Sequence, residues 1–203
     1  MQISLHQASK RFNKEWIFKN LDYTFEAGQH YALIGNNGSG KSTLLQIISG
    51  YSTLTKGTIE WAQHKEGNIF NEISFAAPYL ELVEELTTLE QFQFHATFKP
   101  LQQNISVDEI IDLIGLKSAT HKQIRYFSSG MKQRLKLALA IFSDSPILLL
   151  DEPCSNLDKE GYALYDHLIN QYALHKLIIV GSNDPLEYQF CKQQVNLMDY
   201  KNN

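Results

Sequence analysis

The sequence predicts an α/β fold built around a mostly parallel sheet. Two short runs, Ile147–Leu150 and Leu177–Val180, contain only apolar residues. Strands covered on both faces, as in the middle of a parallel sheet, have this composition. A second observation is a glycine-rich loop between an apolar strand at 31–34 and an apolar helix at 44–48. A strand that leads through such a loop into a helix places the helix N-terminus where an anion can bind.

Two further segments depart from this core. Residues 1–30 and 55–76 contain short alternating segments, such as Ile3 to Leu5, that favour antiparallel strands with one exposed face. Residues from about 89 to 130 are predicted to form an inserted α-helical subdomain. We therefore expect one domain, residues 1–203, in which an N-terminal antiparallel β subdomain and the helical subdomain flank the core.

The shorter elements follow from local patterns in chain order. In the N-terminal subdomain, Thr58–Trp61 and Ile73–Ala76 are predicted to be strands. Ser106 and Glu109 form a capping box at the start of a helix that Gly115 ends. A second helix is predicted over residues 129–142, and a last short strand over residues 195–200.

Residues 35–43 match the phosphate-binding loop G-x-x-x-x-G-K-[ST] without a mismatch. Its glycines allow backbone angles at which successive N–H groups turn inward around an anion. Lys41 places a positive charge on the outer phosphates, and Ser42 offers a hydroxyl to a magnesium ion. We therefore expect a P-loop NTPase core. The residues expected to contact the nucleotide are Gly35, Asn36, Asn37, Gly38, Ser39, Gly40, Lys41, Ser42 and Thr43.

A second motif ends the apolar run at 147–150 with Asp151 and Glu152. A buried strand that ends in an acid presents a carboxylate at the carboxyl edge of the sheet, where open α/β sheets bind ligands. Asp151 is suited to hold the magnesium that bridges the phosphates, and Glu152 is placed to polarise an attacking water. Without the phosphate loop, a solvated strand end would explain both residues.

A third motif lies at residues 126–134. Ser128 is placed as the N-cap of the helix over 129–142, and Gly130 keeps the backbone bare at the helix start. That helix end could bind a second anion. The alternative is a capped helix on which Lys132 and Arg134 are solvated charges.

Taken together and in this order, the three motifs resemble the ATP-binding domain of the ABC ATPase family. Phe127–Met131 resembles the family signature Leu-Ser-Gly-Gly-Gln, with Phe, Ser and Met at the first, third and fifth places. Ser155–Asp158 resembles the loop that crosses the dimer interface. The resemblance covers essentially the whole chain. It implies ATP and Mg²⁺ as cofactors, and a head-to-tail dimer in which Ser128 and Gly130 contact the γ-phosphate held by the partner's Lys41.

Three positions affect which properties of the family can be expected of this chain. Phe12 lies where the family has an aromatic residue that stacks on adenine, although a core aromatic explains it equally well. Pro78 falls at the position of a family glutamine that senses the metal and the coupled domain, and proline offers no side-chain hydrogen bond. Asn183 replaces a histidine that contacts the γ-phosphate. The two departures predict slow or partner-dependent turnover, with nucleotide binding retained.

The leading interpretation is the ATP-hydrolysing motor subunit of an ABC membrane transporter. A net charge of -4 gives no support for nucleic-acid binding, and no apolar run approaches the length of about 18 residues that spans a bilayer. We therefore expect a cytoplasmic chain, peripheral on the inner face of the cell membrane. Its expected partners are a separate membrane-spanning permease subunit and a second ATP-binding domain, either a copy of this chain or a different one.

The docking face is expected at the helical block and at the loop around Pro78. Its apolar residues Leu80, Leu82 and Val83 are candidates for receiving a membrane-domain helix, or they pack under the loop. Two other functions stay open. One is a soluble ABC ATPase of chromosome maintenance, repair or translation, although the chain has no long insertion between residues 44 and 127. The other is a nucleotide-gated regulatory subunit with weak hydrolysis.

Overall fold

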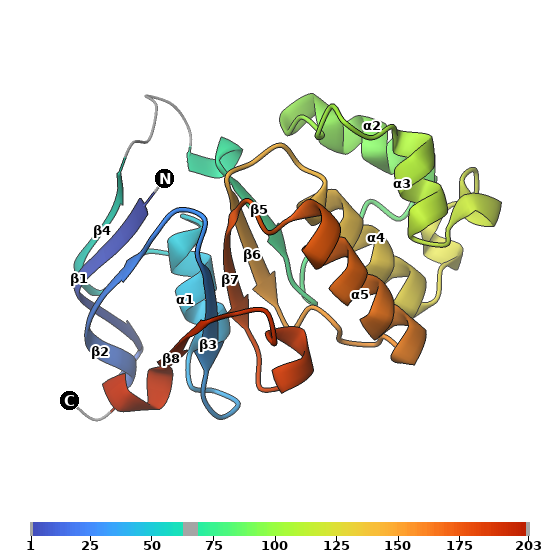
Figure 1. Ribbon diagram of the computed structural model, residues 1–203. Coiled ribbons are helices and arrows are strands. Elements are labelled where there is room, and N and C mark those ends of the chain that lie inside the picture. The colour runs from blue at the N-terminus through green and yellow to red at the C-terminus, as the bar shows by residue number, and fades with distance from the viewer. Residues whose placement is uncertain (1, 63–68, 202–203) are drawn as a thin grey trace.

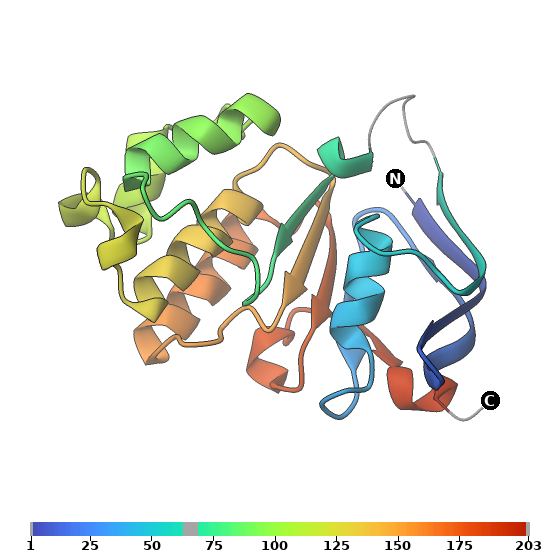
Figure 2. The same cartoon turned by 180° about the vertical axis from the view of Figure 1, so that it is seen from behind.

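The computed structural model describes residues 2–62 and 69–201. Its elements form successive layers across the molecule (Figure 1). An antiparallel sheet lies at one end, α1 (Lys41–Ile48) lies between it and a parallel sheet, and α4 (Ser129–Ile141) and α5 (Lys159–Tyr172) cover the other face of that sheet. The view from behind shows α2 (Thr88–Phe98) and α3 (Val107–Leu113) outside this helical layer (Figure 2). The mixed α/β fold class predicted from the sequence is confirmed.

The parallel sheet has five strands in the order β5-β6-β7-β3-β8. Their bounds are β3 His30–Ile34, β5 Ile73–Ala76, β6 Ile147–Asp151, β7 Leu177–Gly181 and β8 Gln193–Asn196. In the middle of the sheet, Ile179 pairs with Leu149 on one side and with Tyr31 on the other. Because all five strands run parallel, the loops after β3, β6 and β7 leave the sheet at the same edge.

Burial on both faces explains why the central strands are apolar throughout. In β6, Ile147 and Leu149 belong to the hydrophobic cluster on the α1 side, whereas Leu148 and Leu150 belong to the cluster on the α4 and α5 side. Successive side chains of a strand point to opposite faces, so one strand contributes to both cores. The sheet therefore joins the two cores into one body.

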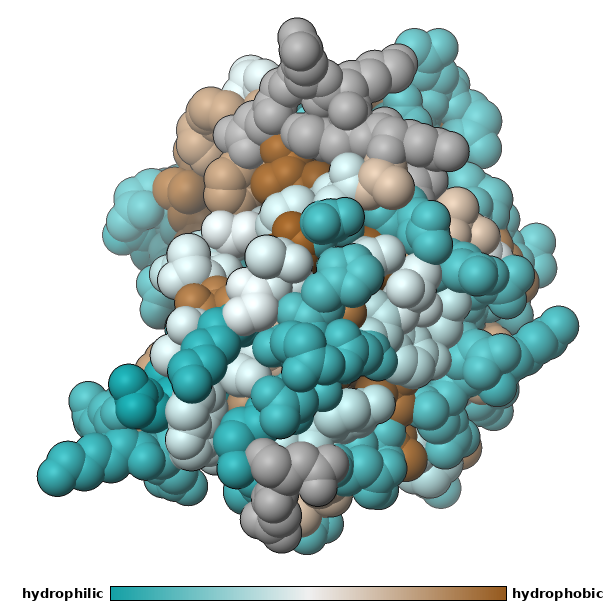
Figure 3. Space-filling model, turned by 90° about the vertical axis from the view of Figure 1, so that its left-hand side faces the viewer, coloured by the Kyte–Doolittle hydropathy of each residue, from teal (hydrophilic) through white to brown (hydrophobic). Residues whose placement is uncertain are grey.

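The antiparallel sheet has the strand order β2-β1-β4, with β1 at Gln2–Phe12, β2 at Glu15–Phe25 and β4 at Lys56–Ala62. Ile3 pairs with Phe25 of β2 and with Trp61 of β4. Its inner residues join the cluster around α1, and its outer face is largely hydrophilic (Figure 3). The alternating pattern thus marks a sheet with one exposed face, as the sequence indicates.

The helical subdomain begins both of its helices with capping boxes. Ser106 caps α3 by accepting from the Glu109 amide at 3.3 Å, and the Glu109 carboxylate accepts from the Ser106 amide at 2.8 Å. Thr87 and Glu90 make the same reciprocal pair at the start of α2, which was not anticipated from the sequence. The capping box predicted at Ser106 is therefore confirmed.

Two predicted details are wrong. Strand β5 belongs to the parallel sheet, where Phe75 pairs with Leu149, and not to the antiparallel subdomain that the range 55–76 assigned it to. Its four residues are too few to distinguish the two sheets by alternation. The last strand is Gln193–Asn196, and residues 197–200 form a 3₁₀ turn instead of continuing it. Residues 63–68 of the predicted range lie outside the described residues.

Among residues 2–62 and 69–201, no helix has both the length and the apolar character needed to cross a bilayer.

Lys176 joins the end of α4 to the start of β7. Its ammonium donates to the carbonyl oxygens of Ile141 at 2.9 Å and Ser143 at 2.5 Å, and the residue is 1% exposed. The pKa of Lys176 is lowered from 10.5 to about 8, chiefly by burial. The nearby Asp144 raises this pKa, and the charge of Lys99 lowers it. The folded chain thus holds this ammonium at a cost in free energy.

We expect this cost to appear in the pH dependence of stability. Between about pH 8 and pH 10.5, the unfolded chain binds more protons at Lys176 than the folded chain does, so folding is favoured as the pH rises. Relative to Lys176→Met, the wild-type free energy of unfolding should therefore increase by about 1–3 kcal/mol over this range. Urea unfolding at pH 8 and pH 10.5 measures it, with the exposed Lys159→Met as control. A difference that does not change with pH would contradict the assignment.

Candidate active site

The phosphate loop joins β3 to α1 and depends on its glycines. Gly40 has φ +103°, and a Cβ atom there would lie 2.4 Å from Cγ2 of Ile17. Gly35 has φ +141°, and its Cβ would lie 2.8 Å from Oγ of Ser39. Because Gly40 is the N-cap of α1 and supplies no side-chain acceptor, the first N–H groups of the helix remain available to an anion.

Lys41 is held in place by backbone and side-chain oxygens. Its ammonium donates to the carbonyl of Gly35 at 2.7 Å and to Oδ1 of Asn183 at 3.1 Å. Asn183 in turn donates its amide to Oδ1 of Asn37 at 2.8 Å. Burial lowers the pKa of Lys41, while Glu152 and Asp151 raise it. Asn183 therefore connects the loop after β7 to both the lysine and the phosphate loop.

Asp151 ends β6 next to the start of α1, and its surroundings fit a divalent cation. The residue is 2% exposed, and its Oδ1 has no hydrogen-bond partner among residues 2–62 and 69–201. Burial raises the pKa of Asp151, and so does the nearby Glu152, whereas the neighbouring hydroxyls of Ser42 and Tyr79 and the Lys41 ammonium lower it. A buried carboxylate oxygen without a donor, beside a serine hydroxyl, is the hard-oxygen environment that Mg²⁺ prefers. Ser42 and Asp151 are thus suited to hold this ion.

Glu152 follows in a left-handed backbone conformation, with φ +43°. Its amide donates to the carbonyl of Gly181 at 2.9 Å, which fixes the turn against the end of β7. The turn directs Glu152 into a small pocket of about 230 Å³ above the phosphate loop. The pocket is lined by Ile17, Asn37, Gly38, Gly40, Lys41, Ser42, Thr43 and Glu152.

The other predicted site residues lie outside this pocket. Ser128 caps α4, where its hydroxyl accepts from the Met131 amide at 3.2 Å, and Gly130 lies in the first turn of that helix. Figure 1 places α4 and α1 on opposite faces of the parallel sheet. Phe12, at the end of β1, is 50% exposed, which excludes the core role, and the Lys10 ammonium lies 4.9 Å from its ring centre. Adenine stacking stays a prediction.

The signature helix is nevertheless connected to the segment after Glu152. Gln133 of α4 donates its amide to the carbonyl of Pro153 at 2.6 Å, and Arg134 lies 3.6 Å from the carboxylate of Asp158. A Cβ atom on Gly130 would lie 3.3 Å from the carbonyl of Asn156. The predicted dimer-interface loop and the start of α4 therefore form one packed unit.

Two residues near the site were missed by sequence reasoning. Tyr79 follows Pro78 directly, and its hydroxyl interacts with Gln46 and Asp151, while burial raises its pKa to about 12. Pro78 contributes its carbonyl, which accepts from Lys136 at 2.8 Å. The side chain that reaches the predicted metal carboxylate from this loop is therefore that of Tyr79 and not that of the residue at position 78. The position of Tyr79 directly after Pro78 was the one sequence feature that could have drawn attention to it.

The second missed residue is Glu187. Its buried carboxylate accepts from the Cys154 amide at 2.8 Å, so it joins the loop after β7 to the segment after Glu152. Burial raises the pKa of Glu187. An isolated acid in a loop gives no sequence signal of such a contact.

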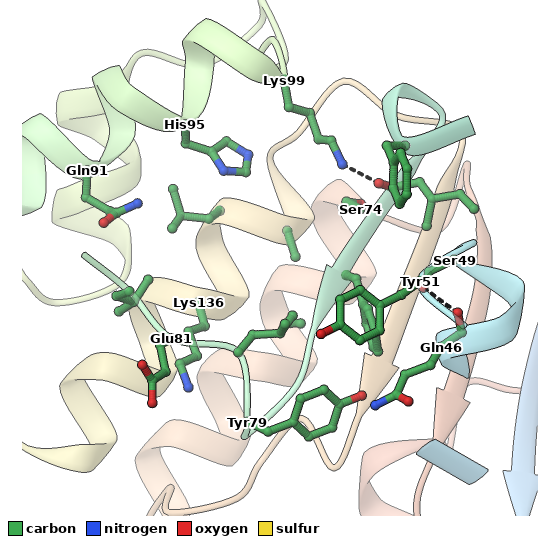
Figure 4. A pocket seen from close by; sticks show the side chains of 18 residues that line it. Gln46, Ser49, Tyr51, Ser74, Tyr79, Glu81, Gln91, His95, Lys99 and Lys136 are labelled. Atoms are coloured by element: carbon green, nitrogen blue, oxygen red, sulfur yellow. Dashed lines mark hydrogen bonds between the residues drawn. The ribbon is translucent and has the colours of Figure 1, made fainter. Parts of the chain in front are cut away.

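A larger groove of about 500 Å³ lies between the end of α1, β5 and the helical subdomain (Figure 4). Leu80 and Leu82 contribute apolar walls, and Lys99, Lys136 and His95 contribute polar groups. Lys99 donates to the carbonyl of Ile73, and burial lowers its pKa to about 8. Tyr79 lies at the end of the groove toward Gln46 (Figure 4).

Known proteins are similar to this chain in sequence and in fold. A sequence profile described as "ABC transporter" matches residues 18–155. The chain is 35% identical to an uncharacterized ABC transporter ATP-binding protein, YybJ, of Bacillus subtilis, over 89% of this chain and 85% of that protein. It is 29% identical to the cytochrome c biogenesis ATP-binding export protein CcmA of Rhizobium johnstonii, over 92% and 90% of the two chains.

Solved structures agree in fold. A putative ABC transporter ATP-binding protein from Pyrococcus furiosus superposes with a TM-score of 0.81 at 21% identity, over 99% of this chain and 100% of that one. The ATP-binding cassette MJ0796, solved as a dimer in a post-hydrolysis state with ADP and phosphate, gives a TM-score of 0.81 at 22% identity, over 96% and 93%.

The fold and the pocket define a P-loop domain that binds a nucleoside triphosphate. The family match and the relatives then place it: the chain belongs to the ABC transporter family. It is an ATP-binding subunit of that family and an ATPase.

We expect Gly40→Ala to weaken nucleotide binding at least about tenfold, because a left-handed non-glycine residue costs about 1–3 kcal/mol and its Cβ displaces Ile17. Equilibrium binding of a fluorescent ATP analogue measures this loss. Gly28→Ala is the matched control, since Gly28 has φ +68° and a Cβ there would meet nothing within 4 Å. The control should lose stability but keep its affinity. An equal loss in both variants would refute a specific role for Gly40.

Proposed function

We propose that this chain is the motor subunit of an ABC membrane transporter and hydrolyses ATP with a bound Mg²⁺ ion at the pocket above the phosphate loop. The observation that carries the proposal is the placement of Glu152 in the same pocket as Lys41 and Ser42. A carboxylate that shares a pocket with a phosphate-binding lysine is suited to act as a base toward water.

Each residue then has a defined task. The amides of the loop and Lys41 hold the β- and γ-phosphates, while Ser42 and Asp151 hold Mg²⁺, which when bound neutralises charge that develops on the phosphate oxygens. Glu152 orients and polarises the attacking water. Asn183 accepts a hydrogen bond from Lys41. Toward the γ-phosphate it offers only a neutral amide donor where the family has histidine, so turnover is expected to be slow.

A second ATP-binding domain completes the site. Ser128 is exposed at the N-terminus of α4, and the pocket of its own chain does not include it. In a head-to-tail dimer, Ser128 and Gly130 of one chain contact the γ-phosphate bound to the other, where the helix N-terminus favours an anion. The cassette MJ0796, which has a similar fold and was solved as a dimer, supports such an arrangement. The partner is a second copy of this chain or a related one.

The membrane-spanning permease binds in the groove next to Tyr79, on the cytoplasmic side of the membrane. The groove is supported as the docking site by its size of about 500 Å³ and by the apolar residues Leu80 and Leu82 at its wall. Of these, Leu82 packs against the core cluster and Leu80 does not, so Leu80 is available to a partner. Val83 lies beside the groove and is 39% exposed.

Turnover tests the site and the dimer together. The rate per chain of Mg-ATP hydrolysis should rise with protein concentration and vanish in Glu152→Gln. Asn183→Ala should lower the rate by about 10- to 100-fold with ATP affinity changed less, because it removes a donor that acts mainly in the transition state. Unchanged turnover in Asn183→Ala would refute this role. A rate equal to that of Glu152→Gln at all concentrations, with ATP bound, would favour a regulatory subunit.

Docking is tested separately by membrane association. In cells that express the native membrane partners, Leu80→Glu should shift the chain from the membrane fraction to the supernatant, because a carboxylate is placed against an apolar partner surface. The matched control is Leu174→Glu, a partly exposed leucine away from the groove. ATP binding should persist in both variants. Equal sedimentation of the two variants would reject the groove as the docking site.

A further inference from the structure

One positive charge in the groove beside α2 has no counterion among the described residues. Lys99 follows α2 directly and lines the groove, where its ammonium donates to the carbonyl of Ile73 (Figure 4). Within residues 2–62 and 69–201, no carboxylate lies close enough to form an ion pair with it. An ammonium has three N–H donors, so two of them have no acceptor in this part of the chain. They are available to an anion that enters the groove.

The other titratable residues of the groove leave this charge unbalanced. Lys136 lies near Glu81, whose negative charge opposes the effect of burial on the pKa of Lys136 (Figure 4). The Nε2 atom of His95 lies 2.8 Å from Oγ of Ser143, and burial lowers the pKa of His95 to about 4, so the imidazole is neutral at pH 7. The charged residues that line the groove are therefore two lysines and one glutamate, and their net charge is +1.

The fold holds the Lys99 ammonium partly out of water. Burial lowers the pKa of Lys99 to about 8. Lys176 lies near enough that the charge of Lys99, added to the larger effect of burial, lowers the pKa of Lys176 as well. The carboxylate of Asp144 raises the pKa of Lys176 but has no such effect on Lys99. A partly desolvated ammonium beside a second cation is stabilised strongly by an anion, so the groove favours a negative charge at the end of α2.

The remaining walls of the groove are largely apolar and define what else an occupant must offer. They include Phe75, Leu80, Leu82, Leu139 and Ala140. A small inorganic anion would neutralise the ammonium but leave these walls exposed to water. A short amphipathic helix places apolar side chains along such a groove and presents a charged residue at its edge. One cation next to apolar walls therefore fits a protein segment that carries a carboxylate.

We propose that the segment of the membrane-spanning partner that docks in the groove carries an aspartate or glutamate, and that its carboxylate forms an ion pair with Lys99. The inference rests on the proposed function, which places the permease in this groove, and it names the chemistry by which the groove selects its partner. A docking segment with a neutral residue at this point leaves the ammonium unpaired, and one with a cationic residue is repelled. Lys99 is thus a specificity-determining residue for the partner.

Binding to membranes tests the ion pair. The purified chain is titrated onto membranes from cells that contain the native membrane partners but lack this chain, and the bound fraction is measured by sedimentation. Lys99→Met should weaken binding at least about tenfold, because it leaves the partner's carboxylate buried without a counterion. Lys99→Arg keeps the positive charge and should bind within about threefold of wild type. Lys159→Met is the matched control, an exposed lysine outside the groove, and ATP binding shows that each variant is folded.

A zero-length cross-linker tests the carboxylate itself, which a merely structural role of Lys99 would not involve. A carbodiimide activates a carboxylate, and an amine in ion-pair contact with it displaces the urea to form an isopeptide bond. On the same membranes, mass spectrometry should find Lys99 joined to an aspartate or glutamate of a membrane-spanning chain. Lys99→Arg should lose this product while it stays bound to the membrane. No product at Lys99, or one that joins it to another copy of this chain or to a soluble protein, would overturn the proposal.

The outcomes separate this inference from docking in the groove. Weaker binding of Lys99→Met, restored in Lys99→Arg and accompanied by the cross-link, supports both. If Lys99→Met binds as tightly as Lys159→Met while Leu80→Glu is released, the ion pair is overturned and the docking site remains. An equal loss in Lys99→Met and Lys99→Arg also overturns the ion pair. If Leu80→Glu binds as tightly as Leu174→Glu, the docking site is rejected and this inference with it.

Discussion

The parallel pairing of β3, β7 and β6 is the constraint on which the site depends. Because Leu33 pairs with Gly181, and Gly181 with Asp151, the ends of the three strands lie in one row. The phosphate loop, the Asp151–Glu152 turn and the Asn183 loop leave from that row and meet over α1. The row leaves little room for a side chain at position 181, because a Cβ on Gly181 would lie 2.9 Å from Cδ1 of Leu45 and 3.3 Å from Oδ1 of Asp151.

Hydrogen bonds between these loops convert proximity into a defined geometry. Asn183 accepts from Lys41 and donates to Asn37, and the Glu152 amide is fixed by the carbonyl of Gly181. The buried Glu187 connects the same region to Cys154, from which the chain continues toward the residues that pack on α4. The segment after Glu152 is therefore in contact with the loop after β7 on one side and with α4 on the other.

The two apolar cores give the molecule its mechanical organisation. One encloses α1 between the two sheets, and the other joins α2, α3, α4 and α5 to the opposite face of the parallel sheet. The groove lies where the helical subdomain meets β5, and Tyr79 extends from its wall toward Asp151. The groove on the outside and the phosphate-loop pocket on the inside therefore lie on either side of the segment that carries Tyr79.

The sequence by itself determined the phosphate loop, the acidic strand end and the helix caps at Ser106 and Ser128, because each is encoded by neighbouring residues whose chemistry is local. Only the tertiary structure decided which sheet receives Ile73–Ala76, since a four-residue strand has the same pattern in either sheet. It likewise decided that Tyr79, and not Pro78, reaches Asp151, and that Asn183 contacts Lys41. Those contacts join residues far apart in the chain, and strand order and register, which bring them together, are set by the packing of the whole core.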